Sequence, residues 1–206
     1  MLLNKRQTLK TNRIYQIPII LASQSPRRIE LMQQAGFRFT TLIPEKFDEI
    51  YPLSLQREEI PLYLARQKAD VFLRSTTIPD DTIVITADTI VWLGEQALGK
   101  PADRPEAIKM LEALSGNMHH VYTGVCLTTN RQQSVFFAES KVFFRPLTDD
   151  EIEYYVDNFN PYDKAGAYGI QEWIGIVGVE KIEGSYENVM GLPIEKLYCE
   201  LRNFIG

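Results

Sequence analysis

A short segment near the N-terminus places two arginines at the expected start of a helix. Ser25 is a typical N-cap and Pro26 suits the first helical position, so Arg27 and Arg28 fall in the first turn. Free backbone N–H groups and the positive end of the helix dipole attract anions there. A helix selected for stability alone would favour Asp or Glu in that turn. The segment therefore predicts an anion site, with two solvated arginines beside a cap as the alternative.

Asp88 lies between two strand-like runs, 82–86 and 89–93, which the pair Ala87-Asp88 is expected to separate. A carboxylate in such a break could bind Mg²⁺ or accept a proton from water. An isolated Asp between strands is more often a turn residue, so that alternative stays open. The other charged candidates are carboxylates of the loop after the second expected strand and two lysines that could hold phosphate: Glu45, Asp48, Glu49, Lys68 and Lys100.

The segment 163–171 combines charge, small residues and an amide in nine positions. Small residues allow the backbone to approach a ligand closely. Gln171 offers both a hydrogen-bond donor and an acceptor, which suits the edge of a pyrimidine base. A tight loop with a purely structural role is the alternative.

Two patterns that suggest other chemistry fail in detail. Residues 94–100 fit the first seven positions of a phosphate-binding P-loop, but Pro101 stands where Ser or Thr must hold Mg²⁺. Gly94 and Glu95 are better explained as a hairpin turn that presents Lys100. His119 and His120 would point to opposite faces of a strand and have no Cys or His companion, so a zinc site is not expected.

The overall composition excludes several classes of function. The 206-residue chain has a net charge of -5, which argues against coating a nucleic acid polymer but allows a phosphorylated small molecule. Cys126 and Cys199 are far apart and are expected to be thiols in a reducing compartment. We find no signal peptide and no apolar run long enough for a membrane span. The expectation is a cytoplasmic protein.

Hydrophobic patterning predicts the elements that would position these residues. The expected strands are 17–22, 38–43, 82–86, 89–93, 121–129, 134–145 and 173–179, with a long hairpin that turns at 130–132. Helices are expected to begin near Ser25, Pro61, Asp103, Thr148 and Pro193. Because strands and helices do not alternate strictly, we expect an α/β fold with a mixed twisted sheet flanked by helices. Residues 1–16 are expected to be an N-terminal extension, and 17–206 a single domain.

Taken together, these segments resemble the Maf family of nucleotide pyrophosphatases. The matching blocks occur in order across nearly the whole chain: 21–28 LASQSPRR, 47–49 FDE, 64–69 LARQKA, 87–91 ADTIV, 98–101 LGKP, 114–125 LSGNMHHVYTGV, 163–171 DKAGAYGIQ and 184–193 GSYENVMGLP. Eight ordered blocks are far more specific than any one of them.

The resemblance implies a two-lobed α/β fold around a cleft, like that of Maf proteins and inosine triphosphatases, often as a homodimer. It implies hydrolysis of nucleoside triphosphates between the α- and β-phosphates, with a divalent cation such as Mg²⁺ or Mn²⁺. The sequence ADT followed by DKAGAYGIQ resembles the branch that acts on dTTP and UTP. The rival activities are 7-methyl-GTP hydrolysis on the same fold and a non-catalytic nucleotide-binding regulator of septum formation.

The resemblance also implies roles for individual residues. Asp88 would be the general base or, with Glu49, a holder of the cation. Arg27, Thr89 and Gln171 match positions linked to substrate choice. The residues that would bind the triphosphate are Ser23, Arg27, Arg28, Lys68 and Lys100.

The sequence departs from the family pattern at two places. Asn160-Pro161 stands where Glu-Pro is common, and Glu172-Trp173 follows the GIQ motif where Gly is usual. Both changes bear on the detailed shape of the base pocket and not on the phosphate chemistry.

Overall fold

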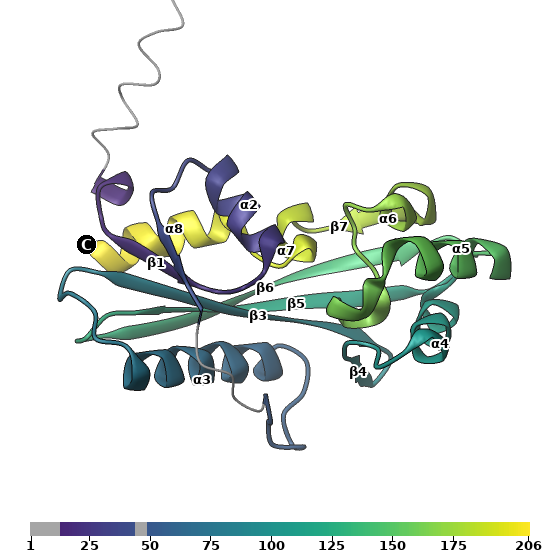
Figure 1. Ribbon diagram of the computed structural model, residues 1–206, viewed down its shortest axis with the longest axis horizontal. Coiled ribbons are helices and arrows are strands. Elements are labelled where there is room, and N and C mark those ends of the chain that lie inside the picture. The colour runs from purple at the N-terminus through teal and green to yellow at the C-terminus, as the bar shows by residue number, and fades with distance from the viewer. Residues whose placement is uncertain (1–12, 44–48) are drawn as a thin grey trace, which may run out of the picture.

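The computed structural model describes residues 13–43 and 49–206, which form a mixed sheet flanked by helices (Figure 1). Within these residues the sheet has seven strands in the order β2-β1-β3-β5-β6-β7, and β4 pairs with β3 beside this path. The strands are β1 Ile19–Ala22, β2 Thr40–Leu42, β3 Ile83–Leu93, β4 Gln96–Leu98, β5 Met118–Thr128, β6 Gln133–Phe144 and β7 Val179–Glu183. The expected α/β class with a mixed sheet is confirmed.

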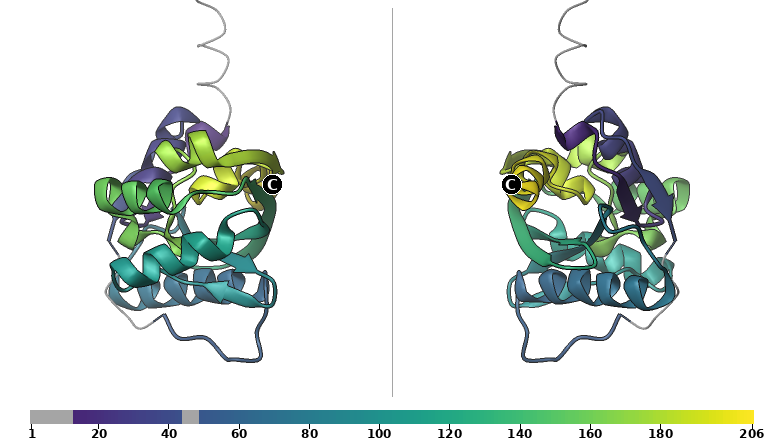
Figure 2. Two further views of the ribbon diagram at one scale, coloured as in Figure 1. Left: turned by 90° about the vertical axis from the view of Figure 1, so that its right-hand side faces the viewer. Right: turned by 90° about the vertical axis from the view of Figure 1, so that its left-hand side faces the viewer.

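Helices cover both faces of this sheet. Helix α3 lies along one face and α2, α7 and α8 lie on the other, while α4, α5 and α6 gather toward one end (Figures 1 and 2). The helical elements are η1 Arg13–Tyr15, α2 Pro26–Gln34, α3 Glu59–Ser75, α4 Arg104–Leu114, α5 Asp149–Phe159, η2 Pro161–Asp163, η3 Ala165–Ala167, α6 Trp173–Gly178, α7 Tyr186–Met190 and α8 Ile194–Ile205. No helix in the part of the chain that the structure describes is long and apolar enough to cross a membrane.

The pairing of β3 leaves a gap along one of its edges. Strand β1 runs parallel to β3 and pairs with it only at residues 83–85, whereas β4 is antiparallel and pairs only at 91–93. On the opposite edge β5 pairs with β3 throughout, from Val84 to Trp92. Residues 86–90 of β3 therefore have no strand partner on the outer edge among the described residues, and the candidate site forms there.

The main core packs between the sheet and the helices α2, α4, α5 and α8. Leu21, Ile85 and Val125 are fully buried in it, as are Leu197 and Leu201 of the last helix. The expected long hairpin is confirmed as β5 and β6, which pair over eleven positions. Residues 13–15 fall within the expected N-terminal extension of residues 1–16, but they form η1, and Ile14 is buried in the same core.

The expected break at Ala87-Asp88 was wrong, because β3 is continuous from Ile83 to Leu93. Ala87 and Asp88 pair with Val125 and Gly124 of β5. Gly124 is needed opposite Asp88, since a Cβ there would lie 2.3 Å from the backbone of Pro61 in α3. Pairing with a distant strand thus carries the chain through residues with low strand propensity.

The strand expected at 173–179 was also wrong. Trp173–Gly178 forms the short helix α6, and the strand β7 begins only at Val179. The carbonyl of Glu172 accepts hydrogen bonds from the N–H groups of Gly175 and Ile176. A Cβ on Gly175 would lie 2.0 Å from the carbonyl oxygen of Ile170, so this turn depends on glycine. The apolar spacing of residues 173–179 is compatible with either a strand or a helix, and tertiary packing decides which of the two forms.

The starts of two helices differ in detail from the expectation, and a third start agrees with it. Ser25 holds the N-cap position of α2 but makes no side-chain capping bond. Helix α3 begins at Glu59, two residues before Pro61, because proline is tolerated in a first helical turn. The capping box of Thr148 and Glu151 at the start of α5 is confirmed in full.

Candidate active site

A cleft of about 780 Å³ opens where the edge of β3 is uncovered. One wall is formed by the end of β1, the start of α2 and the end of α7, and the other by residues 97–100 and the loop 163–171. The middle of β3 and one side of α3 form its floor. The volume is typical of a site for a small molecule.

All nine residues to which the resemblance gives a role line this cleft, although they come from widely separated segments. They are Ser23, Arg27, Arg28, Glu49, Lys68, Asp88, Thr89, Lys100 and Gln171. Glu45 and Asp48, the other two carboxylates considered, lie outside the described residues. The cleft and its two walls match the two-lobed arrangement that we expected.

Asp88 and Lys68 form the most buried ion pair of the cleft floor. The Nζ of Lys68, on α3, lies 2.6 Å from Oδ1 of Asp88 and 3.1 Å from Oε1 of Glu49. The side chain of Asp88 is 10% exposed and that of Glu49 is 44% exposed. One ammonium group therefore holds two carboxylates together, one at the floor and one at the rim of the cleft.

This pair of carboxylates fits the needs of a divalent cation. Mg²⁺ commonly takes one or two carboxylates from a protein and completes its shell with water and substrate phosphate. Glu49 and Asp88 supply that number of oxygen ligands at an accessible position. The described residues contain no cluster of three or more His, Cys, Asp or Glu side chains that would form an all-protein metal site.

Arg28 closes the gap in the β3 edge instead of projecting freely. Its Nη1 donates to the carbonyl of Ala87 at 2.8 Å, and its Nε donates to the carbonyl of Gly191 at 2.7 Å. Burial lowers the pKa of the guanidinium, and the charge of Asp88 opposes that shift. Arg28 thus satisfies an edge carbonyl that no strand reaches, and it ties α2 to β3 and α7.

The side chain of Thr89 is hydrogen-bonded to Arg28 on one face of β3. Its Oγ1 accepts a hydrogen bond from Nη2 of Arg28 at 3.0 Å and lies 3.0 Å from Oγ1 of Thr123. Thr123 in turn donates to the carbonyl of Asn188, whose own side chain is fully buried. A chain of hydrogen bonds therefore links Arg28 through β3 and β5 to α7.

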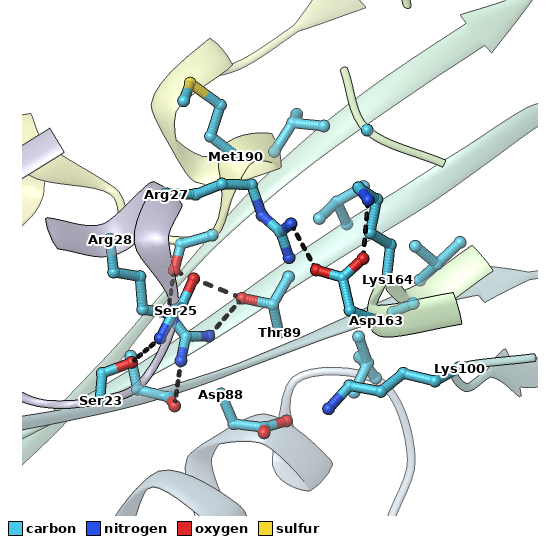
Figure 3. A pocket seen from close by; sticks show the side chains of 18 of the residues that line it. Ser23, Ser25, Arg27, Arg28, Asp88, Thr89, Lys100, Asp163, Lys164 and Met190 are labelled. Carbon is cyan, nitrogen blue, oxygen red and sulfur yellow. Dashed lines mark hydrogen bonds and ion pairs between the residues drawn. The ribbon is translucent and has the colours of Figure 1, made fainter. Parts of the chain in front are cut away.

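The start of α2 presents a serine and an arginine to the cleft. Ser23 is buried, and its Oγ accepts the N–H of Ser25 at 3.2 Å, which leaves its hydroxyl proton to donate elsewhere. Arg27 reaches across the cleft, where its Nη1 lies 3.0 Å from Oδ2 of Asp163 (Figure 3). Lys164 binds the other oxygen of Asp163 at 2.7 Å. The carboxylate of Asp163 is therefore paired with both Arg27 and Lys164, in the place that a substrate anion could take.

Lys100 faces these groups from the opposite wall. Figure 3 shows its side chain extending toward Asp88. Lys100 is exposed, and no ion pair joins it to another described residue. Five cationic and three acidic side chains line the cleft, in a chain whose net charge is -5. The cleft thus concentrates positive charge, as a site for a polyanion requires.

Gln171 carries a polar atom without a partner in the protein. Its Oε1 is buried and has no hydrogen-bond partner among the described residues. A buried acceptor left unpaired is costly. Its position in the cleft lining therefore favours a role in ligand contact over a structural role.

Two residues of the cleft were not assigned a role from the sequence. Asp163 and Lys164 appeared only as members of the loop 163–171, because charged neighbours are normally taken as solvated. The structure shows that Lys164 is 7% exposed. The signal that could have found it is a lysine among small residues, where only a paired ammonium group can be buried.

Comparisons of the sequence with known proteins give a family match and two relatives with the same name. A family model described as "Maf-like protein" matches residues 18–204. A protein of Bacteroides fragilis named dTTP/UTP pyrophosphatase is 56% identical over 184 residues, which cover 89% of this chain and 94% of that protein. A protein of Parabacteroides distasonis with the same name is 53% identical over 186 residues, covering 90% and 95% of the two chains.

Among solved structures, a HAM1 protein from Coxiella burnetii aligns with a TM-score of 0.48 and 15% identity. The alignment covers 91% of this chain and 99% of that one.

Proposed function

This chain belongs to the Maf family, and we propose that it is a pyrophosphatase that hydrolyses dTTP and UTP to the monophosphate and pyrophosphate. The observation that carries the proposal is the meeting of Asp88, Glu49 and Lys68 in a cleft lined by further cations. The names of relatives more than 50% identical to this chain support the choice of dTTP and UTP.

The cationic walls would bind the triphosphate. Lys100 is available to a phosphate oxygen without breaking any ion pair with a described residue, whereas Arg27 would have to leave Asp163. Ser23 and the free N–H groups at the start of α2 add neutral donors. Arg28 would act mainly by holding α2 against β3, since three of its donors are already bound within the protein.

Asp88 would direct the water that attacks. In the proposed reaction a water oxygen bonds to the α-phosphorus, the bond from that phosphorus to the bridging oxygen breaks, and pyrophosphate leaves. Asp88 would accept the proton of the water, and Lys68 at 2.6 Å would fix the carboxylate in place. Most of the rate enhancement would come from positioning and from positive charge around the phosphate oxygens.

We also propose that Glu49 and Asp88 hold a divalent cation, Mg²⁺ or Mn²⁺. When bound, such a cation supplies positive charge beside the phosphate oxygens and lowers the pKa of water. The support is the pair of carboxylates at 3.1 and 2.6 Å from one ammonium group. Lys68 would then be shared between these carboxylates and the substrate.

Gln171 would contact the base. Uracil and thymine share an edge with a carbonyl and an N–H, which one amide group can match. The unpaired Oε1 of Gln171 supports this role.

We further propose a cytoplasmic protein that can form a homodimer. Self-association is supported by apolar side chains exposed at and beside the edge strand β2, namely Leu42 and Ile43.

The proposal is tested with a panel of nucleotides. The protein is incubated with dTTP, UTP, CTP, ATP, GTP and 7-methyl-GTP in the presence of Mg²⁺ or Mn²⁺, and the products are separated and quantified. UMP and pyrophosphate in equal amounts are expected from UTP. Release of UDP and free phosphate would reject the proposed bond cleavage, and fastest turnover of 7-methyl-GTP would reject the proposed substrate.

A further inference from the structure

A small polar network that the proposed mechanism does not use lies against the loop 163–171, which carries Gln171. Oε1 of Glu172 lies 3.1 Å from Nζ of Lys164. Oε2 of the same carboxylate accepts a hydrogen bond from the hydroxyl of Tyr155, on α5. That hydroxyl accepts the backbone N–H of Gly169 at 2.9 Å. The network thus ends on the backbone of the segment that carries Gln171.

These groups are held away from water. Tyr155 is fully buried, and the side chains of Lys164 and Glu172 are 9% and 20% exposed. Burial and the neighbouring carboxylate raise the pKa of Tyr155, so its hydroxyl keeps its proton and can donate to Glu172. Polar groups in such surroundings are strongly bound to one another, because leaving any of them unpaired is costly.

Glu172 also packs directly against the loop. A Cβ added to Gly169 would lie 2.7 Å from Cδ of Glu172 and 3.0 Å from Nε2 of Gln171. The carboxylate of Glu172 cannot easily move aside, since both of its oxygens are engaged. Gly169 is thus in close contact with both Glu172 and the amide of Gln171.

We propose that Glu172 and Tyr155 are positioning residues that fix Gly169–Gln171 and so set the selectivity for the base, although neither contacts the substrate. This inference rests on the proposed hydrolysis of pyrimidine nucleotides. It gives a role to the Glu-Trp sequence that departs from the family pattern: Glu172 supplies the carboxylate to which Lys164 and Tyr155 both donate.

Glutamine at position 172 cannot accept both of these hydrogen bonds. Both partners of the carboxylate are donors, and a glutamine side chain has an acceptor at one end only. Glu172→Gln would place an NH₂ group against either Lys164 or Tyr155. Tyr155→Phe keeps the ring packed against Phe159 but removes the acceptor of the Gly169 N–H. The two variants therefore disturb one network from its two ends with little change in volume.

The test separates the base end of the site from the phosphate end. For each variant we would measure kcat and KM for UTP, and the inhibition constant of inorganic tripolyphosphate, which has no base. Matched controls are Tyr154→Phe and Glu153→Gln, which change exposed residues of the same helix. Thermal unfolding of all variants reports any general loss of stability.

We expect Tyr155→Phe and Glu172→Gln each to lower kcat/KM for UTP about tenfold, mainly through KM, as for one unpaired buried polar group. The inhibition constant of tripolyphosphate should change little. The double variant should lose about as much as either single one, because both break the same network.

Three outcomes would overturn the inference. They are unchanged UTP kinetics in active variants, equal weakening of UTP and tripolyphosphate, and additive losses in the double variant. If the unsubstituted protein makes no UMP and pyrophosphate from UTP, the proposed function fails as well. Activity in the unsubstituted protein together with unaffected variants would reject the positioning role alone.

Discussion

Asp88 and Thr89 are adjacent in the sequence, yet their side chains lie on opposite faces of β3. Asp88 meets Lys68 of α3 on one face, and Thr89 meets Arg28 of α2 on the other. This follows from the alternation of side chains along a strand. Both residues still line the cleft, because the cleft crosses the sheet where the outer edge of β3 is uncovered. The two residues therefore serve different parts of the site.

Asp88→Asn should lower kcat for UTP by at least about 100-fold, the usual loss when a general base is removed. The amide has nearly the same shape but cannot accept the proton of water, and it leaves Lys68 paired with Glu49 alone. Steady-state kinetics and thermal unfolding would be measured together. The control is Asp81→Asn, the same change at an exposed residue outside the cleft. Turnover close to that of the control would remove Asp88 from the mechanism.

Hydrolysis in water enriched in ¹⁸O should place the heavy oxygen in UMP. Attack at the α-phosphorus joins the solvent oxygen to the monophosphate, and pyrophosphate leaves with the original bridging oxygen. Mass spectrometry of both products gives the answer in one experiment. Label in pyrophosphate instead would mean attack at the β-phosphorus and would reject the proposed reaction.

Thr89→Val should weaken the site by removing the acceptor of an Arg28 hydrogen bond. The donor at Nη2 of Arg28 would then be half-buried without its partner, at a cost of about 1–3 kcal/mol. We expect a lower melting temperature and a higher KM for UTP. Thr89→Ser keeps the hydroxyl and should preserve both values. Equal behaviour of the Val and Ser variants would show that the hydroxyl of Thr89 does not hold Arg28.

Stability should fall in mild acid because of His119. This histidine is fully buried beside Tyr168, and burial lowers its pKa to about 3 from an unperturbed value of 6.5. The folded state therefore resists protonation, so the stabilisation is complete above pH 6.5 and is lost as pH falls toward 3. The free energy of unfolding should drop by up to roughly 1.4 kcal/mol per pH unit in that range.

His119→Phe provides the comparison for this pH dependence. Phenylalanine keeps a ring against Phe144 but cannot bind a proton. The slope of unfolding free energy against pH between 6.5 and 4 should become shallower, whatever the absolute stability of the variant. Chemical denaturation at several pH values measures this slope. Identical slopes for the two proteins would show that His119 does not cause the pH dependence of stability.

Local signals in the sequence predicted the parts of the fold that depend on local structure. The capping box at Thr148 and the long hairpin formed as expected. The continuity of β3 could not be predicted, since Asp88 is held in the strand by pairing with Gly124, 36 residues further along the chain. The segment 173–179 has apolar spacing that suits a strand or a helix, and this spacing does not reveal the close approach of Gly175 to the carbonyl of Ile170 that the helix requires.

The members of the site were easier to predict than their contacts. Every nominated residue within the described range lines the cleft. The bonds from Arg28 to Ala87 and Gly191 depend on where β1 and β4 stop, and no local pattern encodes that. The hydrogen-bond network of Glu172 could not be predicted from the sequence either, because Tyr155 and Gly169 come from separate elements.

The strongest test of base choice is the comparison of UTP or dTTP with GTP and ATP. Gln171 can pair with the carbonyl and N–H edge that uracil and thymine share, whereas a purine presents a larger ring and leaves the amide unpaired. One unpaired buried polar group costs about 1–3 kcal/mol, so kcat/KM for the pyrimidine nucleotides should be at least about tenfold higher. Gln171→Ala should narrow this gap mainly by slowing the pyrimidine reaction, because the purines lose no contact. Gln67→Ala, the same change on α3 outside the cleft lining, controls for loss of an amide. Equal rates on all four nucleotides would show that Gln171 does not read the base.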